Sequence, residues 1–130
     1  MKKILVTGSK GFIGKHLVKR LSELNYTVIE FEGDITNEES YKPLLNESIH
    51  HCFHLAAKSF VPESWNSPEA FVKTNVLGTE YVLEFCREKS IALTFLSSYL
   101  YGSPKYLPID EKHPLQTPNP YALSKFLAEE

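Results

Sequence analysis

The amino-acid sequence predicts an α/β fold in which a doubly wound parallel sheet carries helices on both faces. Two observations support this prediction. Short aliphatic segments of strand length alternate with segments of helical period along the chain, and a glycine-rich turn follows the first strand. Such alternation implies right-handed crossovers and a ligand site at the carboxyl ends of the strands.

The elements follow one another in a regular order. The expected strands cover residues 3–7, 27–32, 48–57 and 91–97, and the expected helices cover residues 12–24, 42–46, about 68–87 and the stretch from 120 onward. Pro43 disfavours a regular helix in the second of these. Residues 102–120 form a proline-punctuated loop, after which Asn119 and Pro120 are typical of an N-cap and a first helical position.

Length and composition restrict the classes of protein to consider. The 130 residues correspond to one domain, residues 1–130, and a hydrophobic content of 42% is enough for a single packed core. A net charge of −2 with both signs spread along the chain predicts neither a nucleic-acid partner nor a membrane surface. We expect no signal peptide and a cytoplasmic location, where Cys52 and Cys86 would be small buried thiols.

The glycine-rich turn is a candidate phosphate site. Gly8, Gly11 and Gly14 separate the first strand from the first helix, whose free N–H groups and positive dipole end favour an anion. Their spacing departs by one residue from the usual dinucleotide pattern, so a turn that binds nothing is the alternative. Glu32 follows Gly14 by 18 residues (32 − 14), about where a carboxylate would bind an adenosine ribose.

Tyr121 and Lys125 form a candidate catalytic pair. They are four residues apart on the last predicted helix, so their side chains share one face. A neighbouring ammonium favours the phenolate that a tyrosine base requires, and it can also reach a ribose hydroxyl. Ser97 and Ser98 end the fourth strand at the same edge, where a hydroxyl could bind a substrate oxygen.

Six motifs of the chain occur in one order. They are Thr7-Gly8-x-x-Gly11-x-x-Gly14, Gly33-Asp34-Ile35, His54-Leu55-Ala56-Ala57, Asn75-x-x-Gly78-Thr79, Ser97-Ser98-x-x-Tyr101-Gly102 and Pro120-Tyr121-x-x-Ser124-Lys125. In this order they resemble the extended short-chain dehydrogenase/reductases of the NAD-dependent epimerase/dehydratase type, in particular the nucleotide-sugar epimerases and reductases. The resemblance runs from residue 4 to the last residue and implies a Rossmann-like sheet that is incomplete at the C-terminus.

The resemblance also implies roles for individual residues. Tyr121 would be the acid or base, Lys125 would orient the nicotinamide ribose, and Ser97, five residues before Gly102, would be the catalytic hydroxyl in preference to Ser98. The residues implied in binding NAD or NADP are Gly8, Lys10, Gly11, Phe12, Ile13, Gly14, Glu32, Asp34, Ile35, Leu55, Ala56, Ala57, Lys58, Asn75, Tyr121 and Lys125.

Two acidic residues compete for the ribose position. The family usually has a helix and a strand between the ribose acid and the Gly-Asp-Ile turn, whereas here Gly33 alone separates Glu32 from Asp34. We expect Glu32 at the ribose, with Asp34 as the rival. A carboxylate there repels the 2′-phosphate of NADP, which favours NAD, although Lys10 could meet that phosphate.

The implied reaction is epimerisation or 4-keto reduction of a nucleotide sugar, by hydride transfer at sugar C4. Dehydratases of this superfamily carry acidic residues directly after the catalytic hydroxyl, and here those positions are Ser98 and Tyr99, so a 4,6-dehydratase is the disfavoured alternative. A non-catalytic dinucleotide-binding or interaction module is a second alternative. Three histidines, His50, His51 and His54, crowd one strand, but no carboxylate or cysteine completes a metal site.

The length of the chain affects the expected activity. The family continues for more than another hundred residues, which supply the substrate domain, so we expect residues 1–130 to be an inactive N-terminal part. Phe126 and Leu127 would then form an exposed apolar stripe that favours homo-oligomers.

Overall fold

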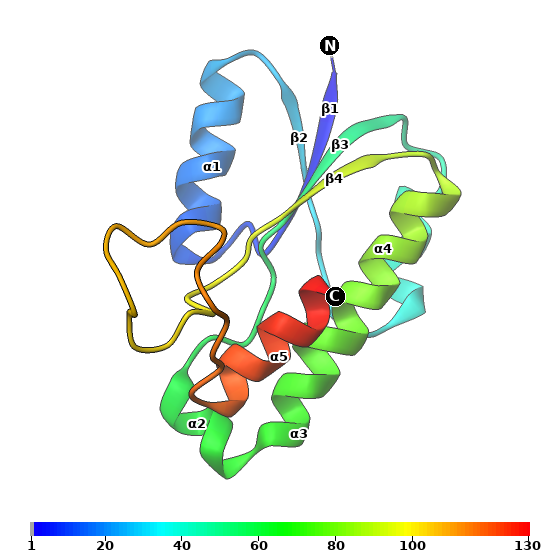
Figure 1. Cartoon of the computed structure of the whole chain (residues 1–130). Helices are drawn as coiled ribbons and strands as arrows, with labels where there is room; N and C mark the ends of the chain where they lie inside the picture. Colours follow the sequence, from blue (N-terminus) through cyan, green and yellow to red (C-terminus); the bar gives the residue numbers. More distant parts are fainter. Residues whose placement is uncertain (1) are drawn as a thin grey trace.

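The computed structural model describes residues 2–130 and contains a four-stranded, wholly parallel sheet (Figure 1). Its order is β2-β1-β3-β4, with β1 at Lys3–Thr7, β2 at Thr27–Glu30, β3 at Ile49–His54 and β4 at Ala92–Phe95. Leu5 pairs with Ile29 on one side and with Cys52 on the other. The predicted doubly wound α/β fold is confirmed.

Alternating side chains of β1 divide the core between the two faces of the sheet. Ile4 and Val6 pack with Leu21 of α1 (Phe12–Glu23), while Leu5 packs with Val82 and neighbouring residues of α4 (Gly78–Glu88). This is the period of two that a strand imposes. Figure 1 shows α1 on one side of the sheet and α4 on the other, and α5 (Pro120–Glu129) packs against the segment Val72–Leu77 that precedes α4.

The short helix expected at residues 42–46 lies earlier in the chain. It is a 3-10 helix, η1, at Glu38–Leu44, and the Asn37 side chain caps it by accepting from the Glu39 N–H. Pro43 lies inside it, and a proline cannot donate the backbone hydrogen bond of a regular helix. Runs of 3-10 helix are short, and this one ends at Leu44, directly after the proline.

The long helix expected at residues 68–87 is continuous but not uniform. It consists of α3 (Pro68–Phe71), a π-helical segment η2 (Val72–Leu77) and α4. Asn75 lies buried in the π segment, and π-helical turns occur frequently at functional sites. A further helix, α2 (Val61–Asn66), was not predicted.

Three strands are shorter than expected at their carboxyl ends. β2, β3 and β4 stop at Glu30, His54 and Phe95, so the residues after them form loops instead of continuing the sheet. These loops lie at one edge of the sheet, where a ligand site is expected.

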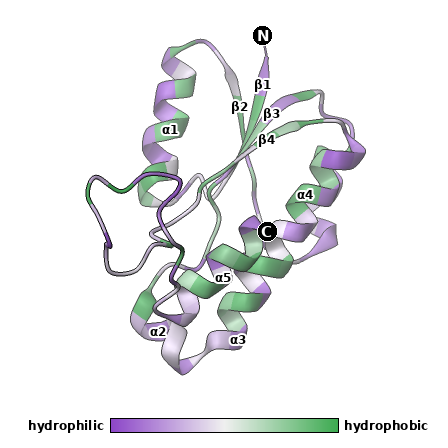
Figure 2. Cartoon of the chain, in the orientation of Figure 1, coloured by the Kyte–Doolittle hydropathy of each residue, from purple (hydrophilic) through white to green (hydrophobic). Residues whose placement is uncertain are grey.

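Apolar character is concentrated unevenly over the helices. Figure 2 shows α5 as largely hydrophobic, and its Leu123 and Leu127 are exposed. Within residues 2–130, no helix combines the length and the apolar character needed to cross a bilayer.

Candidate active site

The glycine turn after β1 is shaped by close backbone contacts. Gly8 has a φ of +68°, and a Cβ there would lie 2.7 Å from the Ala56 nitrogen. A Cβ on Gly14 would lie 2.1 Å from the Gly8 carbonyl oxygen, and the Gly11 N–H donates to that same oxygen at 3.0 Å. Side chains at Gly8 and Gly14 would therefore fill the space in which the backbone bends to begin α1.

A cleft of about 500 Å³ opens at the carboxyl ends of the strands. It joins the glycine turn, the loops after β2, β3 and β4, and one face of α5. The predicted site residues that line it are Gly8, Gly11, Phe12, Ile13, Gly14, Asp34, Ile35, Leu55, Ala56, Ala57, Lys58, Ser97, Tyr121 and Lys125. The sequence analysis missed four other lining residues, Gly33, Ser59, Thr74 and Leu96. The residues implied by separate motifs thus surround one cleft.

Lys10 and Glu32 lie in an adjoining hollow of about 220 Å³. It shares Gly8 and Ala56 with the main cleft, and Ser9 also lines it. The Lys10 ammonium lies 3.5 Å from the Glu32 carboxylate, with both side chains well exposed. The Ser9 hydroxyl is buried and has no hydrogen-bond partner within the described residues.

Asp34, the rival acid, lines the main cleft with its carboxylate fixed in place. Its Oδ1 accepts from the Thr36 N–H and the Thr36 hydroxyl, both at 2.8 Å. These two hydrogen bonds, the backbone one first, lower the pKa of Asp34, so the group is negatively charged at neutral pH. The two competing carboxylates therefore occupy neighbouring hollows.

Asn75 does not line the cleft but supports its wall. Its Oδ1 accepts from the Lys58 N–H at 2.7 Å, and its Nδ2 donates to the Lys58 carbonyl at 2.9 Å and to the Ser124 hydroxyl at 2.9 Å. Because Ser124 belongs to α5, this one buried amide joins the loop after β3 to the helix that carries Tyr121.

Tyr121 is held between aromatic rings at the start of α5. The Phe71 and Tyr99 rings lie 6.4 and 6.0 Å from its ring centre. The Ser98 hydroxyl is 3.1 Å from the Tyr121 hydroxyl, whereas the Ser97 hydroxyl donates to Glu129 at 2.5 Å. Both strand-end serines therefore contact α5, but at different places.

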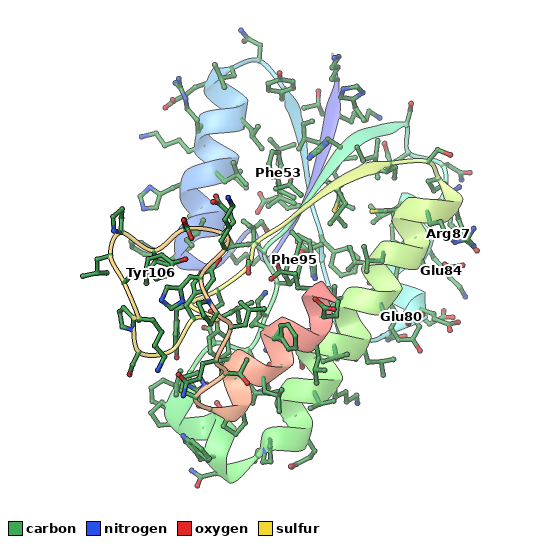
Figure 3. All side chains as sticks on the ribbon, in the orientation of Figure 1. Phe53, Glu80, Glu84, Arg87, Phe95 and Tyr106 are labelled. Carbon is green, nitrogen blue, oxygen red and sulfur yellow. The ribbon has the colours of Figure 1, made fainter. Side chains whose placement is uncertain are left out.

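Lys125 is a buried cation at the base of the cleft. Its ammonium lies 4.1 Å from the centre of the Phe95 ring, at the end of β4, and Figure 3 shows Phe95 between the sheet and α5. Burial lowers the pKa of Lys125 to about 8, although Glu129 partly opposes this shift. The ammonium is thus mostly charged at pH 7 and titrates just above it.

His54, buried beneath the cleft, has neighbours that fix its tautomer. The Thr7 hydroxyl oxygen accepts from the Leu55 and Ala56 N–H groups, and it lies 2.6 Å from His54 Nδ1. With its oxygen accepting two bonds, the Thr7 hydroxyl donates its proton to Nδ1. Nε2 then donates to the Thr79 hydroxyl at 2.9 Å, and Thr79 donates to the Asn75 carbonyl.

This network makes His54 a neutral structural group. Burial, with the nearby Lys125 charge, lowers the pKa of His54 to about 4. Among residues 2–130, His, Cys, Asp and Glu side chains form no group of three or more suited to a metal ion. The sequence analysis did not predict this network. The threonines at the end of β1 and on α4 are the sequence feature that indicates it.

The fold and the cleft define a class of protein. Parallel strands and a glycine turn that begins a helix, with a cleft at the carboxyl ends of the strands, are the features of a dinucleotide-binding α/β protein. Residues 4–130 match the model of the NAD dependent epimerase/dehydratase family. The chain belongs to this family, which confirms the predicted resemblance.

Individual relatives agree with this assignment. UDP-glucose 4-epimerase of Mus musculus is 33% identical over 165 residues, covering 100% of this chain and 48% of the relative. The structure of UDP-glucose 4-epimerase from Bifidobacterium longum, in complex with NAD+ and UDP, is similar with a TM-score of 0.91 at 27% identity over 98% of this chain and 47% of that one. RMD from Pseudomonas aeruginosa, complexed with NADPH, has a TM-score of 0.86 at 32% identity, with 99% and 47% covered. The chain thus spans about half the length of these relatives.

Proposed function

We propose that this chain is the cofactor-binding and acid–base half of an NAD-dependent nucleotide-sugar epimerase or 4-keto reductase of the extended short-chain dehydrogenase/reductase type. One observation carries the proposal: the glycine turn, Asp34, Tyr121 and Lys125 line a single cleft. Its residues fit a dinucleotide, because Gly8 and Gly14 leave a cradle that a Cβ would fill. A bound nicotinamide would take a hydride from sugar C4 and return it in an epimerase, whereas in a 4-keto reductase the reduced form would donate a hydride to C4.

The chain's own residues would carry out the proton transfer. Tyr121 would take the proton of the C4 hydroxyl as the hydride leaves and give it back when the hydride returns. Lys125 would favour the phenolate by its positive charge and bind the nicotinamide ribose. A strand-end serine hydroxyl would bind the C4 oxygen beside Tyr121. Asp34 and Ile35 would contact the adenine, and the small Ala56–Ala57 turn would lie under the cofactor.

NAD is the proposed cofactor, with NADP as the alternative. Glu32 would accept hydrogen bonds from the adenosine ribose and repel a 2′-phosphate, while Lys10 would attract one. Substrate binding would need residues beyond this half, so we propose that residues 1–130 alone turn over no sugar nucleotide. Neither Ser98 nor Tyr99 supplies the carboxylate that a 4,6-dehydratase needs after its catalytic hydroxyl.

A calorimetric titration of NADH and NADPH into the 130-residue chain tests the proposal. We expect binding of NADH in the wild type and in Tyr121→Phe, which keeps the cradle, and no turnover of UDP-glucose by either. Absence of binding at millimolar NADH and NADPH would refute the cofactor site, and with it the alternative of a non-catalytic dinucleotide-binding module. Turnover of UDP-glucose by the 130-residue chain would contradict the proposal that this chain alone is inactive.

Self-association is a second part of the proposal. Exposed apolar side chains on the η2–α4 and α5 helices support a homo-oligomer, and these are Val72, Leu77, Leu83, Leu123 and Leu127. The mass in solution, measured by light scattering over a range of concentrations, should rise above 14.8 kDa. Replacing Leu123 and Leu127 by Ser should restore the monomer mass, and a monomer in the wild type at all concentrations would contradict the proposal.

A further inference from the structure

The strand β2 forms an open edge of the sheet. Within residues 2–130 it has one neighbouring strand, β1, and the pairing runs regularly from Lys3 with Thr27 to Val6 with Glu30. Neither a proline nor a shift of register interrupts β2. A regular edge strand presents a row of backbone groups to which another strand can bind.

The register determines which backbone groups of β2 face outward. The Thr27 N–H and the Phe31 N–H donate to carbonyl groups on the β1 side, at 3.1 and 3.0 Å. Successive residues of a strand direct their N–H and C=O groups to opposite edges. The backbone groups of Val28 and Glu30 therefore face away from β1, and no other part of residues 2–130 forms a hydrogen bond with them.

A hollow of about 280 Å³ lies beside this edge. Its apolar lining comes from Ile29 and Phe31 at the strand, and from Pro43 and Leu44 at the end of η1. Ile29, Phe31 and Leu44 belong to the core on the sheet face that carries α4. A strand paired with β2 would place every second side chain on this face, so the hollow fits an apolar side chain of such a strand.

The charge beside this edge is negative. Glu30 is exposed, points to the face opposite Ile29 and forms no ion pair within residues 2–130. Glu32 is also exposed, and its one ion-pair contact is long, at 3.5 Å. Glu47, which lines the hollow, is already paired with Lys3 at 2.6 Å. The face that carries Glu30 is therefore complementary to a cation.

We infer that the open edge of β2 is a docking site for an extended segment of another protein, in which basic and apolar side chains alternate. The backbone of this segment would bind the outward groups of Val28 and Glu30. Its apolar side chains would enter the hollow, and its basic side chains would face the Glu30 carboxylate on the other face. The inference goes beyond the proposed function, since no residue of β2 lines the cleft.

A second copy of this chain fits the edge less well. Residues 24–33, which comprise β2 and its flanks, contain the carboxylates of Glu30 and Glu32 but no Lys, Arg or His. Pairing two such strands would supply no cation to either carboxylate. Charged side chains on an edge strand also oppose pairing between identical chains.

Hydrogen exchange, followed by ¹⁵N NMR on the 130-residue chain, tests the open edge. In the free chain the Val28 and Glu30 N–H groups should exchange faster than the Ile29 N–H, which faces β1. The probe is a blocked hexapeptide in which lysine and valine alternate. Its addition should shift the Val28 and Glu30 signals and slow their exchange, whereas a hexapeptide of alternating glutamate and valine should do neither.

Two substitutions at one position separate the charge from the backbone. Glu30→Gln should weaken the affinity for the lysine peptide about 2- to 5-fold, the effect of one exposed ion pair. Glu30→Pro also removes an outward N–H that the pairing with β1 does not use, and should weaken it about 2- to 10-fold further. Slow exchange at Ile29 shows in each variant that β1 and β2 still pair. Glu69→Gln on α3 is the control and should bind as the wild type.

Several results would overturn the inference. They are absence of binding at millimolar lysine peptide, equal binding of the glutamate peptide, and signal shifts that centre away from β2. Protection of Val28 and Glu30 that rises with protein concentration alone would place a second copy at the edge and would also overturn it.

Discussion

The Asn75 side chain holds the backbone of Lys58 through both of its polar atoms. Oδ1 accepts from the Lys58 N–H at 2.7 Å, and Nδ2 donates to the Lys58 carbonyl at 2.9 Å. These two bonds satisfy both backbone polar groups of Lys58, which lies outside the sheet. The loop after β3 therefore has a fixed shape where it borders the cleft.

Removing this amide should destabilise the chain. Asn75→Ala leaves the Lys58 backbone groups and the Ser124 hydroxyl without that partner, and we expect the free energy of unfolding to fall by about 2–4 kcal/mol. NADH affinity should fall as well, because the cleft wall loses its support. Urea denaturation and calorimetry measure the two effects, with the exposed Asn66→Ala as control. Unchanged stability would show that the buried amide is not needed to hold the loop.

Glu32 should control the choice between the two cofactors. Removing its charge in Glu32→Ala takes away the repulsion of a 2′-phosphate and frees Lys10 from its 3.5 Å ion pair. We expect the affinity ratio of NADPH to NADH to rise about 3- to 10-fold, the size of one charge contact near a protein surface. Competitive titration measures the ratio, with the exposed Glu69→Ala as control. If Asp34→Asn raises the ratio more, Asp34 is the acid at the ribose.

His54 should make the chain sensitive to acid. Its pKa is about 4 in the folded chain against 6.5 in the unfolded chain, so the unfolded state binds the extra proton first as the pH falls. This contribution to stability is complete above pH 6.5 and is lost towards pH 4, by up to about 3 kcal/mol. His54→Gln should flatten the pH dependence of urea unfolding between pH 4 and 6.5. If the free energy of unfolding depends on pH equally in His54→Gln and in the wild type, His54 is not the cause of the acid sensitivity. His16→Gln on α1 serves as the control.

Lys125 should make cofactor binding sensitive to base. Its pKa of about 8 means that the ammonium is lost as the pH rises above 8, whereas an ordinary lysine stays charged to about pH 10. NADH affinity should therefore fall between pH 7 and 9.5, by up to the 10- to 100-fold that a charged hydrogen bond contributes. Lys125→Met should bind more weakly at pH 7 and lose the pH dependence, and the exposed Lys19→Met should behave as wild type. An unchanged affinity in Lys125→Met would contradict a ribose contact.

Local patterns sufficed to predict the elements that border the cleft. The hydrophobic period of neighbouring residues predicts β1 and α1, and the glycines between them predict the turn. The predicted N-cap of α5 is confirmed, because the Asn119 side chain accepts from the Ala122 N–H at 2.8 Å. Tyr121 and Lys125 are four residues apart on one helix, so the helical period predicts that their side chains share a face. Both side chains line the cleft.

Other features depend on contacts distant in sequence. The π segment around Asn75 depends on partners in the loop after β3 and on α5, and no helical pattern reveals it. The position of Glu32 outside the main cleft depends on how β2 ends, and Ser97 and Ser98 meet different side chains of α5, Glu129 and Tyr121. Sequence spacing could predict these neighbourhoods but not the individual atoms that meet.

The strand order has a consequence for how the molecule assembles. β1 lies inside the sheet, and each later strand adds to an edge that already exists, so pairing can proceed in the order of synthesis. The glycine turn and the loops at Asp34 and Ala56 come from the first half of the chain, whereas Tyr121 and Lys125 come from its last helix. An emerging chain would therefore form its glycine turn before the helix that carries Tyr121 and Lys125.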